Sequence, residues 1–218
     1  MNGQELVEAV RDGRATQLDR LGSDKYLVAA TGADLERAPV LRTVAESAAS
    51  GRDTFGAWAD EGVGDPATAF GTAAEREADH FDRVVDSLAA LPNDDADAAD
   101  VIDAADDPLH DVLADCDGTV ERLAAAFVGR PLVADRTRLQ VVNFFVNEAD
   151  ERRAELARDL RADSGDRLDE GVELLDAACG SDDDWERARR AAERVVGAAY
   201  GAYVDALEAM GVDPKPVC

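Results

Sequence analysis

The chain of 218 residues carries 48 acidic and 23 basic residues, so its formal net charge at pH 7 is -25. Nucleic acid and anionic membrane surfaces are disfavoured as partners, because proteins bind both mainly through lysine and arginine. With 46% hydrophobic residues, the chain can bury one sizeable core, and we expect residues 1–218 to form a single helical domain.

The acidic residues occur in segments that also carry apolar residues at helical spacing. This pattern indicates a folded protein with a carboxylate-covered surface, because a disordered acidic chain would lack the periodicity. Lys25 and Lys215 are the only lysines. The composition resembles that of proteins from halophilic archaea that accumulate salt in the cytoplasm. Molar KCl shortens the Debye length to about 3 Å, so we expect low salt to destabilise the protein.

The cysteines Cys116, Cys179 and Cys218 are far apart, and the sequence contains no Cys-x-x-Cys pair. It therefore predicts neither a zinc site nor a rubredoxin-type iron site. Reduced thiols of this kind are typical of a cytosol. Residues 1–11 are acidic and amphipathic, which favours neither a signal peptide nor a membrane span. We therefore expect a cytoplasmic protein.

Helical periodicity dominates the chain, and strand patterns are nearly absent. We expect helices, in chain order, over residues 4–21, 24–30, 34–61, 65–90, 109–127, 135–160, 167–179 and 184–210. Residues 93–107, rich in Asp and Ala, indicate a solvated acidic connector between two halves. This layout predicts an all-α fold, a ferritin-like four-helix bundle over residues 34–160, with extra N-terminal helices and C-terminal helices over residues 161–218.

The second long helix places a carboxylate in an apolar face. Its apolar stripe includes Ala74 and Phe81, and Glu77 fills the position between them. His80 follows three residues later and projects from the same side. A buried carboxylate needs a metal ion or a charged partner to offset its lost hydration. Glu77 and His80 are therefore candidate metal ligands, and Arg52 is the alternative, an ion-pair partner for Glu77.

Glu-x-x-His on a bundle helix is the half-site from which ferritin-like di-iron proteins are built. Through residues 76–80 and the acidic residues 147–153, the chain resembles the rubrerythrin branch of the ferritin-like superfamily. This resemblance implies a di-iron centre and a role in peroxide reduction, oxidative stress or iron storage. It implies that the metal ligands are Glu77, His80, Glu148 and Glu151, joined by Glu46 and Glu121 from two other helices.

The chain also departs from that pattern. Glu46 lies roughly 200° around its helix from the inward-facing Val44, and Glu121 points aside from the apolar seam of its helix. The last bundle helix offers Glu148 and Glu151 but no histidine. A complete di-iron centre would require these helices to rotate from the phases that their apolar residues predict.

Three functions remain open. The first is a rubrerythrin-related iron protein, which as an enzyme would be a di-iron oxidoreductase with an incomplete site. The second is a non-enzymatic helical scaffold or adaptor on the same fold, with an eroded metal site in which Glu77 pairs with Arg52. The third is an assembly chaperone of the TorD type, a family with an acidic segment ending in Asp-His, here Asp79-His80. Flanking helices also suggest a homodimer.

Overall fold

The computed structural model describes residues 1–92 and 102–214, and within these ranges it contains helices and no strand. The prediction of an all-α protein is therefore confirmed. The helical elements are α1 (Gly3–Gly13), α2 (Ala15–Leu21), α3 (Lys25–Ala30), α4 (Arg37–Glu61), α5 (Gly64–Ala89), the 3-10 turn η2 (Ala104–Asp106), α6 (His110–Ala114), α7 (Thr119–Ala124), the π-helical turn η3 (Ala125–Gly129), α8 (Arg130–Asn147), α9 (Glu151–Ala178) and α10 (Asp182–Ala209).

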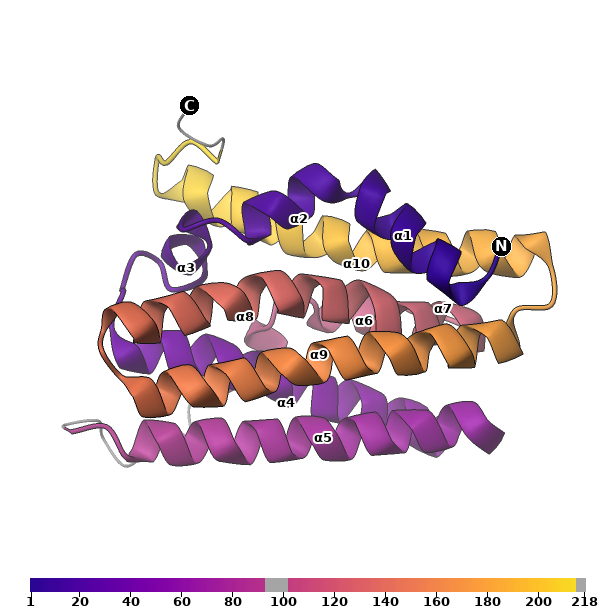
Figure 1. Ribbon diagram of the computed structural model, residues 1–218, viewed down its shortest axis with the longest axis horizontal. Coiled ribbons are helices and arrows are strands. Elements are labelled where there is room, and N and C mark those ends of the chain that lie inside the picture. The colour runs from indigo at the N-terminus through magenta and orange to yellow at the C-terminus, as the bar shows by residue number, and fades with distance from the viewer. Residues whose placement is uncertain (93–101, 215–218) are drawn as a thin grey trace.

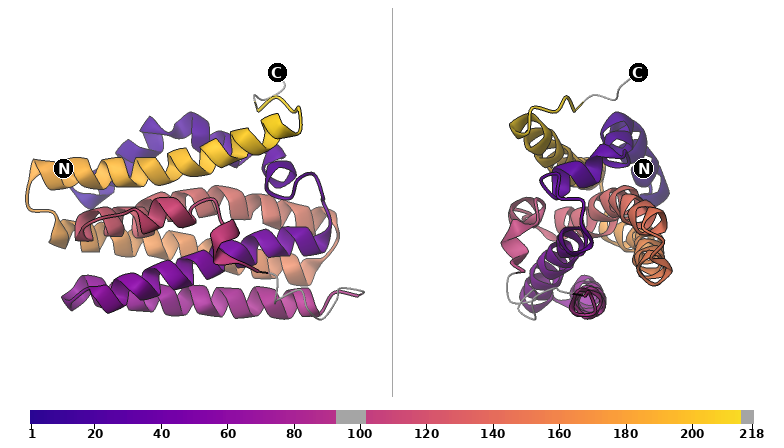
Figure 2. Two further views of the ribbon diagram at one scale, coloured as in Figure 1. Left: turned by 180° about the vertical axis from the view of Figure 1, so that it is seen from behind. Right: turned by 90° about the vertical axis from the view of Figure 1, so that its left-hand side faces the viewer.

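Four of the long helices form two hairpins that lie against each other. α4 packs along α5, and α8 packs along α9 (Figure 1). α10 lies on the other side of α8 together with α1 and α2, so the end-on view shows α4 and α5 at one edge and α10 at the other (Figure 2). The molecule is thus an all-α helical bundle with its first and last helices outside the two central hairpins.

The helix boundaries differ from the sequence-based expectation in several places. The helix expected over residues 4–21 is divided into α1 and α2, and the one expected over residues 109–127 is divided into α6, α7 and the start of η3. α7, η3 and α8 follow one another directly, although we expected one helix to end at residue 127 and the next to begin at residue 135. Pro131 lies in the first turn of α8, directly after the π-helical turn, where a residue without an N–H is tolerated. The helix expected over residues 135–160 is instead interrupted at Ala149, whose φ is 54°. Asp150 caps α9, which runs through residue 160 to Ala178.

The buried apolar residues form two clusters. One cluster includes Phe55, Phe70 and Phe127 and extends to α10. The other includes Leu41, near the N-terminal end of α4, and Phe145, near the C-terminal end of α8. Between them, buried polar side chains come from the middle of α4 and α5, the first half of α8 and the middle of α9. This polar layer is the part of the core that the fold positions for chemistry.

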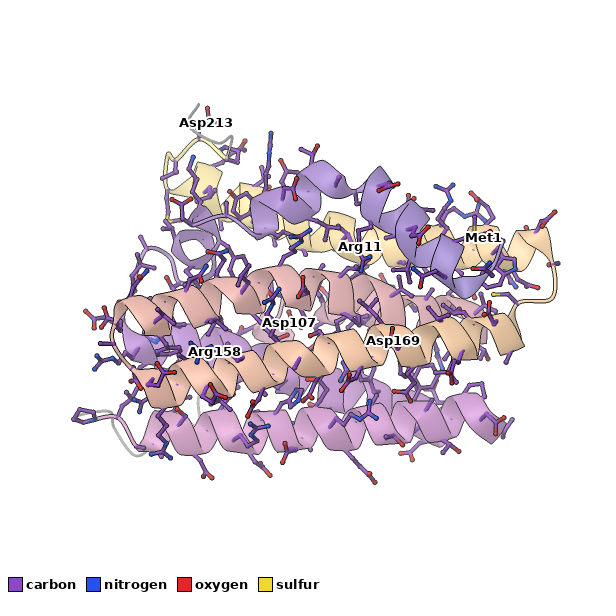
Figure 3. The ribbon with its side chains drawn as sticks, in the orientation of Figure 1. Met1, Arg11, Asp107, Arg158, Asp169 and Asp213 are labelled. Carbon is purple, nitrogen blue, oxygen red and sulfur yellow. The ribbon has the colours of Figure 1, made fainter. Side chains whose placement is uncertain are left out.

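Charged side chains cover the outward faces of the helices, and many end in oxygen atoms that point away from α1 and α5 (Figure 3). Among residues 1–92 and 102–214, no helix combines the length and apolarity needed to cross a lipid bilayer. Cys116 and Cys179 are free thiols, and Cys218 lies outside the described residues.

Part of the predicted acidic connector is not solvated. Residues 93–101 lie outside the described part of the chain, but residues 102–107 pack beside α4. Asp107, at the end of this segment, is only 7% exposed. The prediction of a solvated connector is therefore wrong for Asp107, because neighbouring helices close around it.

Candidate functional site

Glu77 lies at the centre of the polar layer and is completely buried. Arg130 of α8 and Arg167 of α9 both donate to its Oε1, and the distance from Nη1 of Arg167 is 2.6 Å. The second oxygen, Oε2, lies 4.0 Å from Nη2 of Arg138. Burial acts to raise the pKa of Glu77, but the charges of Arg130 and Arg167 overcome it and hold this pKa well below its usual range.

The arginines are anchored to the helices that face α5. Nη2 of Arg130 donates to the backbone oxygen of Ser47 on α4 at 2.5 Å. Nη1 of Arg138 donates to the backbone oxygen of Leu160 at 2.5 Å and to Oγ of Ser164 at 3.0 Å, both on α9. Burial lowers the pKa of Arg138 to about 10, and the charges of the neighbouring arginines act in the same direction. These contacts tie α4, α8 and α9 to one carboxylate of α5.

Local backbone features make room for Arg130. The π-helical turn η3 immediately precedes it, and such turns shift the direction of the side chains that follow. On α4, Gly51 is the residue that faces its guanidinium: a Cβ atom there would lie 2.6 Å from Nη2 of Arg130. The absent side chain at Gly51 therefore leaves the space that this guanidinium occupies.

His80 joins the buried centre to the surface. It is 1% exposed, and its Nε2 lies 2.6 Å from Oδ2 of Asp163, a half-buried carboxylate on α9. Its Nδ1 lies 3.6 Å from Oε2 of Glu77, and neither of these two atoms has a hydrogen-bond partner among the described residues. The preceding residue, Asp79, is exposed and lies 3.6 Å from Arg83. The Asp-His pair is therefore divided between the surface and the core.

Arg52 does not reach Glu77, so the predicted ion pair is wrong. Nε of Arg52 lies 2.7 Å from Oδ1 of Asp53, and its guanidinium lies 4.9 Å from the ring centroid of Phe81. The buried face of α4 passes through Gly51, and the next residue is displaced by about 100° around the helix. This displacement places Arg52 beside the core.

The predicted ligands Glu148 and Glu151 lie at helix ends, away from the polar layer in the middle of the bundle. Glu148 follows the end of α8 and is exposed, with Oε2 3.3 Å from Nη2 of Arg37. Glu151 begins α9 and is exposed, with Oε1 2.9 Å from Nη1 of Arg158. Both carboxylates take part in surface ion pairs, which contribute little to stability.

The remaining two predicted ligands also lie elsewhere. Glu121 is in the first turn of α7, and its Oε1 lies 3.6 Å from Nη1 of Arg187. Glu46 is half-buried on α4 and lines a separate cavity. Of the six predicted ligands, the structure thus brings together Glu77 and His80.

The residues around Glu77 do not fit a di-iron centre. Such a centre takes four carboxylates and two histidines, whereas three guanidinium groups surround Glu77 and carry the same sign of charge as iron. Within the described ranges, no group of three or more His, Cys, Asp or Glu side chains could hold a metal ion.

The arginine cluster could have been found in part from the sequence. On α9, the buried positions Leu160, Ser164, Arg167, Gly171 and Leu175 follow helical spacing, so Arg167 lies on an inward face. Our expected boundaries split this helix and hid that pattern. The inward position of Arg130 could not be predicted from helical spacing, because its orientation depends on the π-helical turn before it.

A cavity of about 200 Å³ lies beside the cluster and shares Arg130 and Arg138 with it. α3, α4, α8, α10 and the turn before α6 surround this cavity. Glu46, Asp106 and Asp107 supply carboxylates to its wall. Burial raises the pKa of both Glu46 and Asp107, and the charge of Asp106 contributes at Glu46.

Comparisons with known proteins add no relative to these observations. No family model matches the chain, and no curated protein or solved structure matches it.

Proposed function

We propose that the protein is a non-enzymatic helical scaffold on a ferritin-like bundle, in which an arginine–glutamate cluster takes the place of a metal centre. The observation that carries this proposal is the pair of hydrogen bonds from Arg130 and Arg167 to Oε1 of Glu77. A carboxylate that two guanidinium groups already neutralise has no need of a metal ion to offset its burial.

The arrangement of the helices supports the ferritin-like part of the proposal. Two hairpins of long helices are joined by a long connection, as in ferritin-like folds. Glu77 and His80 are three residues apart on α5, and Ser164 and Arg167 are three residues apart on α9 in the same polar layer. Ser164 and Arg167 thus have the spacing of a second Glu-x-x-His half-site, but their side chains cannot bind iron as that half-site does.

An iron-binding, rubrerythrin-related protein is the competing proposal. The observation in its favour is the approach of Nδ1 of His80 to within 3.6 Å of Oε2 of Glu77, with neither atom hydrogen-bonded among the described residues. Against it, the charges of Arg130, Arg138 and Arg167 oppose the entry of a cation into this layer.

Metal content distinguishes the two proposals. Protein purified in molar KCl would be loaded anaerobically with Fe(II), desalted and analysed for bound iron and for ultraviolet-visible absorption. The wild type, Glu77→Gln and the control Glu75→Gln, at an exposed position of α5, should all retain no stoichiometric iron. About two irons per chain in the wild type and in Glu75→Gln, but not in Glu77→Gln, would establish a di-iron protein and refute the scaffold.

A further inference from the structure

The cavity beside the arginine–glutamate cluster has apolar walls from several helices. The apolar part of its lining comes from α2, α3, α4, α8 and α10 and includes Leu21, Ala29, Val44, Val133, Val141 and Ala202. The cavity volume is about 200 Å³, and an apolar cavity of about 150 Å³ is large enough to hold benzene. A single aromatic ring with a short substituent therefore fits by volume, and it would lose its hydration favourably against these side chains.

Hydroxyl groups in the lining already have partners within the protein. Oγ1 of Thr43 and Oγ1 of Thr137 each donate to a backbone oxygen of their own helix, at 2.9 and 3.4 Å. Oγ of Ser47 accepts a hydrogen bond of 3.3 Å from Nη2 of Arg130. The hydroxyl of Tyr203 donates to a backbone oxygen beyond α10 at 3.5 Å. These groups therefore do not depend on a polar ligand to satisfy them.

The buried charged groups of the lining are also held by the protein. Arg130 donates to Glu77 and Ser47, and Nη1 of Arg138 donates to α9. Oδ1 of Asp107 accepts a hydrogen bond of 3.2 Å from a backbone N–H, and the charge of Arg130 acts on the same carboxylate. An ion that entered the cavity would give up its hydration beside groups that already have partners, which is costly.

Two further carboxylates of the lining are less buried. Asp106 is exposed and Glu46 is half-buried, so both can keep water while a ligand occupies the apolar side. They repel an anion. The charge of Arg42 acts on Glu46, so a cation would have to compete with this arginine.

The apolar walls and the committed polar groups together indicate an uncharged ligand. We propose that this cavity binds a small uncharged molecule with a compact apolar body, such as a single aromatic ring with a short alkyl group. This inference goes beyond the scaffold role and does not depend on the metal content of the bundle.

Three probes with the same ring test the preference for an uncharged ligand. Isothermal titration calorimetry in molar KCl at pH 7 would compare toluene, benzylammonium and benzoate. Toluene should bind with a Kd of about 1 mM or less, and each ion should bind at least about tenfold more weakly because of its lost hydration. No binding of toluene up to its solubility limit would overturn the proposal, as would an affinity of either ion that is within about tenfold of that of toluene or tighter.

Two variants and one control locate the site. Ala134→Leu on α8 and Ala202→Leu on α10 each enlarge a side chain of the lining and should weaken toluene binding by about tenfold or more. Ala209→Leu makes the same chemical change at an exposed position of α10 and should bind toluene as the wild type does. Circular dichroism melting would verify that each variant is folded. Wild-type affinity in either folded lining variant would place toluene elsewhere and refute the assignment.

Discussion

Arg167 on α9 donates a hydrogen bond of 2.6 Å to Oε1 of Glu77 on α5, 90 residues earlier in the chain. Together with the bond from Arg130 to the same oxygen, it joins the two central hairpins through one buried carboxylate. A buried ion pair contributes little net stability compared with apolar residues of the same shape, but removal of one partner leaves uncompensated charge. The effect of a substitution in this cluster therefore depends on what it leaves unpaired.

Glu77→Gln should lower the free energy of unfolding by about 3–5 kcal/mol, because it leaves buried arginines without their counter-charge. Arg52→Ala should lower it by about 0–1 kcal/mol, because Arg52 is half-exposed and pairs with Asp53 at the surface. Denaturant titration in molar KCl, followed by circular dichroism, measures both values. Similar losses in the two variants would contradict the assignment of Arg130 and Arg167 as the partners of Glu77.

Gly51→Ala should destabilise the protein by about 1–3 kcal/mol through overpacking. The three atoms nearest to the added Cβ all belong to the guanidinium of Arg130, at 2.6 to 2.9 Å, and that group cannot move without losing its contacts to Glu77 and Ser47.

Gly56→Ala, on the same helix, is the matched control. Nothing lies within 4 Å of its added Cβ, so it should stabilise the protein by about 0.5–1 kcal/mol through helix propensity. Thermal melting of the two variants beside the wild type decides the point. A gain in stability for Gly51→Ala would mean that Arg130 is not held against α4.

Asp107→Asn should raise the melting temperature at pH 7. Burial raises the pKa of the Asp107 carboxyl, so the folded state binds its proton more tightly than the unfolded state does. Stability from this group is then fully present below the unfolded pKa of about 3.9 and is lost as the pH rises through the folded pKa. The advantage of the variant should shrink as the pH falls towards 4, and a constant difference from pH 4 to pH 7 would exclude this cause.

Low salt should destabilise the wild type. With a net charge of -25, the folded chain repels itself, and the Debye length grows from about 3 Å at 1 M salt to about 30 Å at 0.01 M. The melting temperature should therefore rise steadily with KCl concentration between these limits. The same melting temperature in dilute buffer and in molar KCl would contradict the interpretation of the acidic surface as an adaptation to salt.

The position of Glu77 was predictable because it follows from local geometry. Helical spacing along α5 predicted that this residue faces the core, and it is completely buried. The spacing placed Phe81 in the buried stripe as well, but Phe81 is half-buried and His80 occupies that face. Adjacent residues of a helix point in directions about 100° apart. In a polar segment, apolar spacing therefore does not decide which of two adjacent residues faces the core.

The sequence by itself determined the helical class, the acidic surface and the inward position of Glu77, because these depend on composition and on spacing within single helices. Only the tertiary structure decided which charges meet Glu77. Arg130 and Arg167 lie 53 and 90 residues away along the chain, and their approach depends on how α8 and α9 pack against α5. The burial of Asp107 also depends on the tertiary structure. α4 and the other helices around the cavity pack over this end of the acidic residues 102–107.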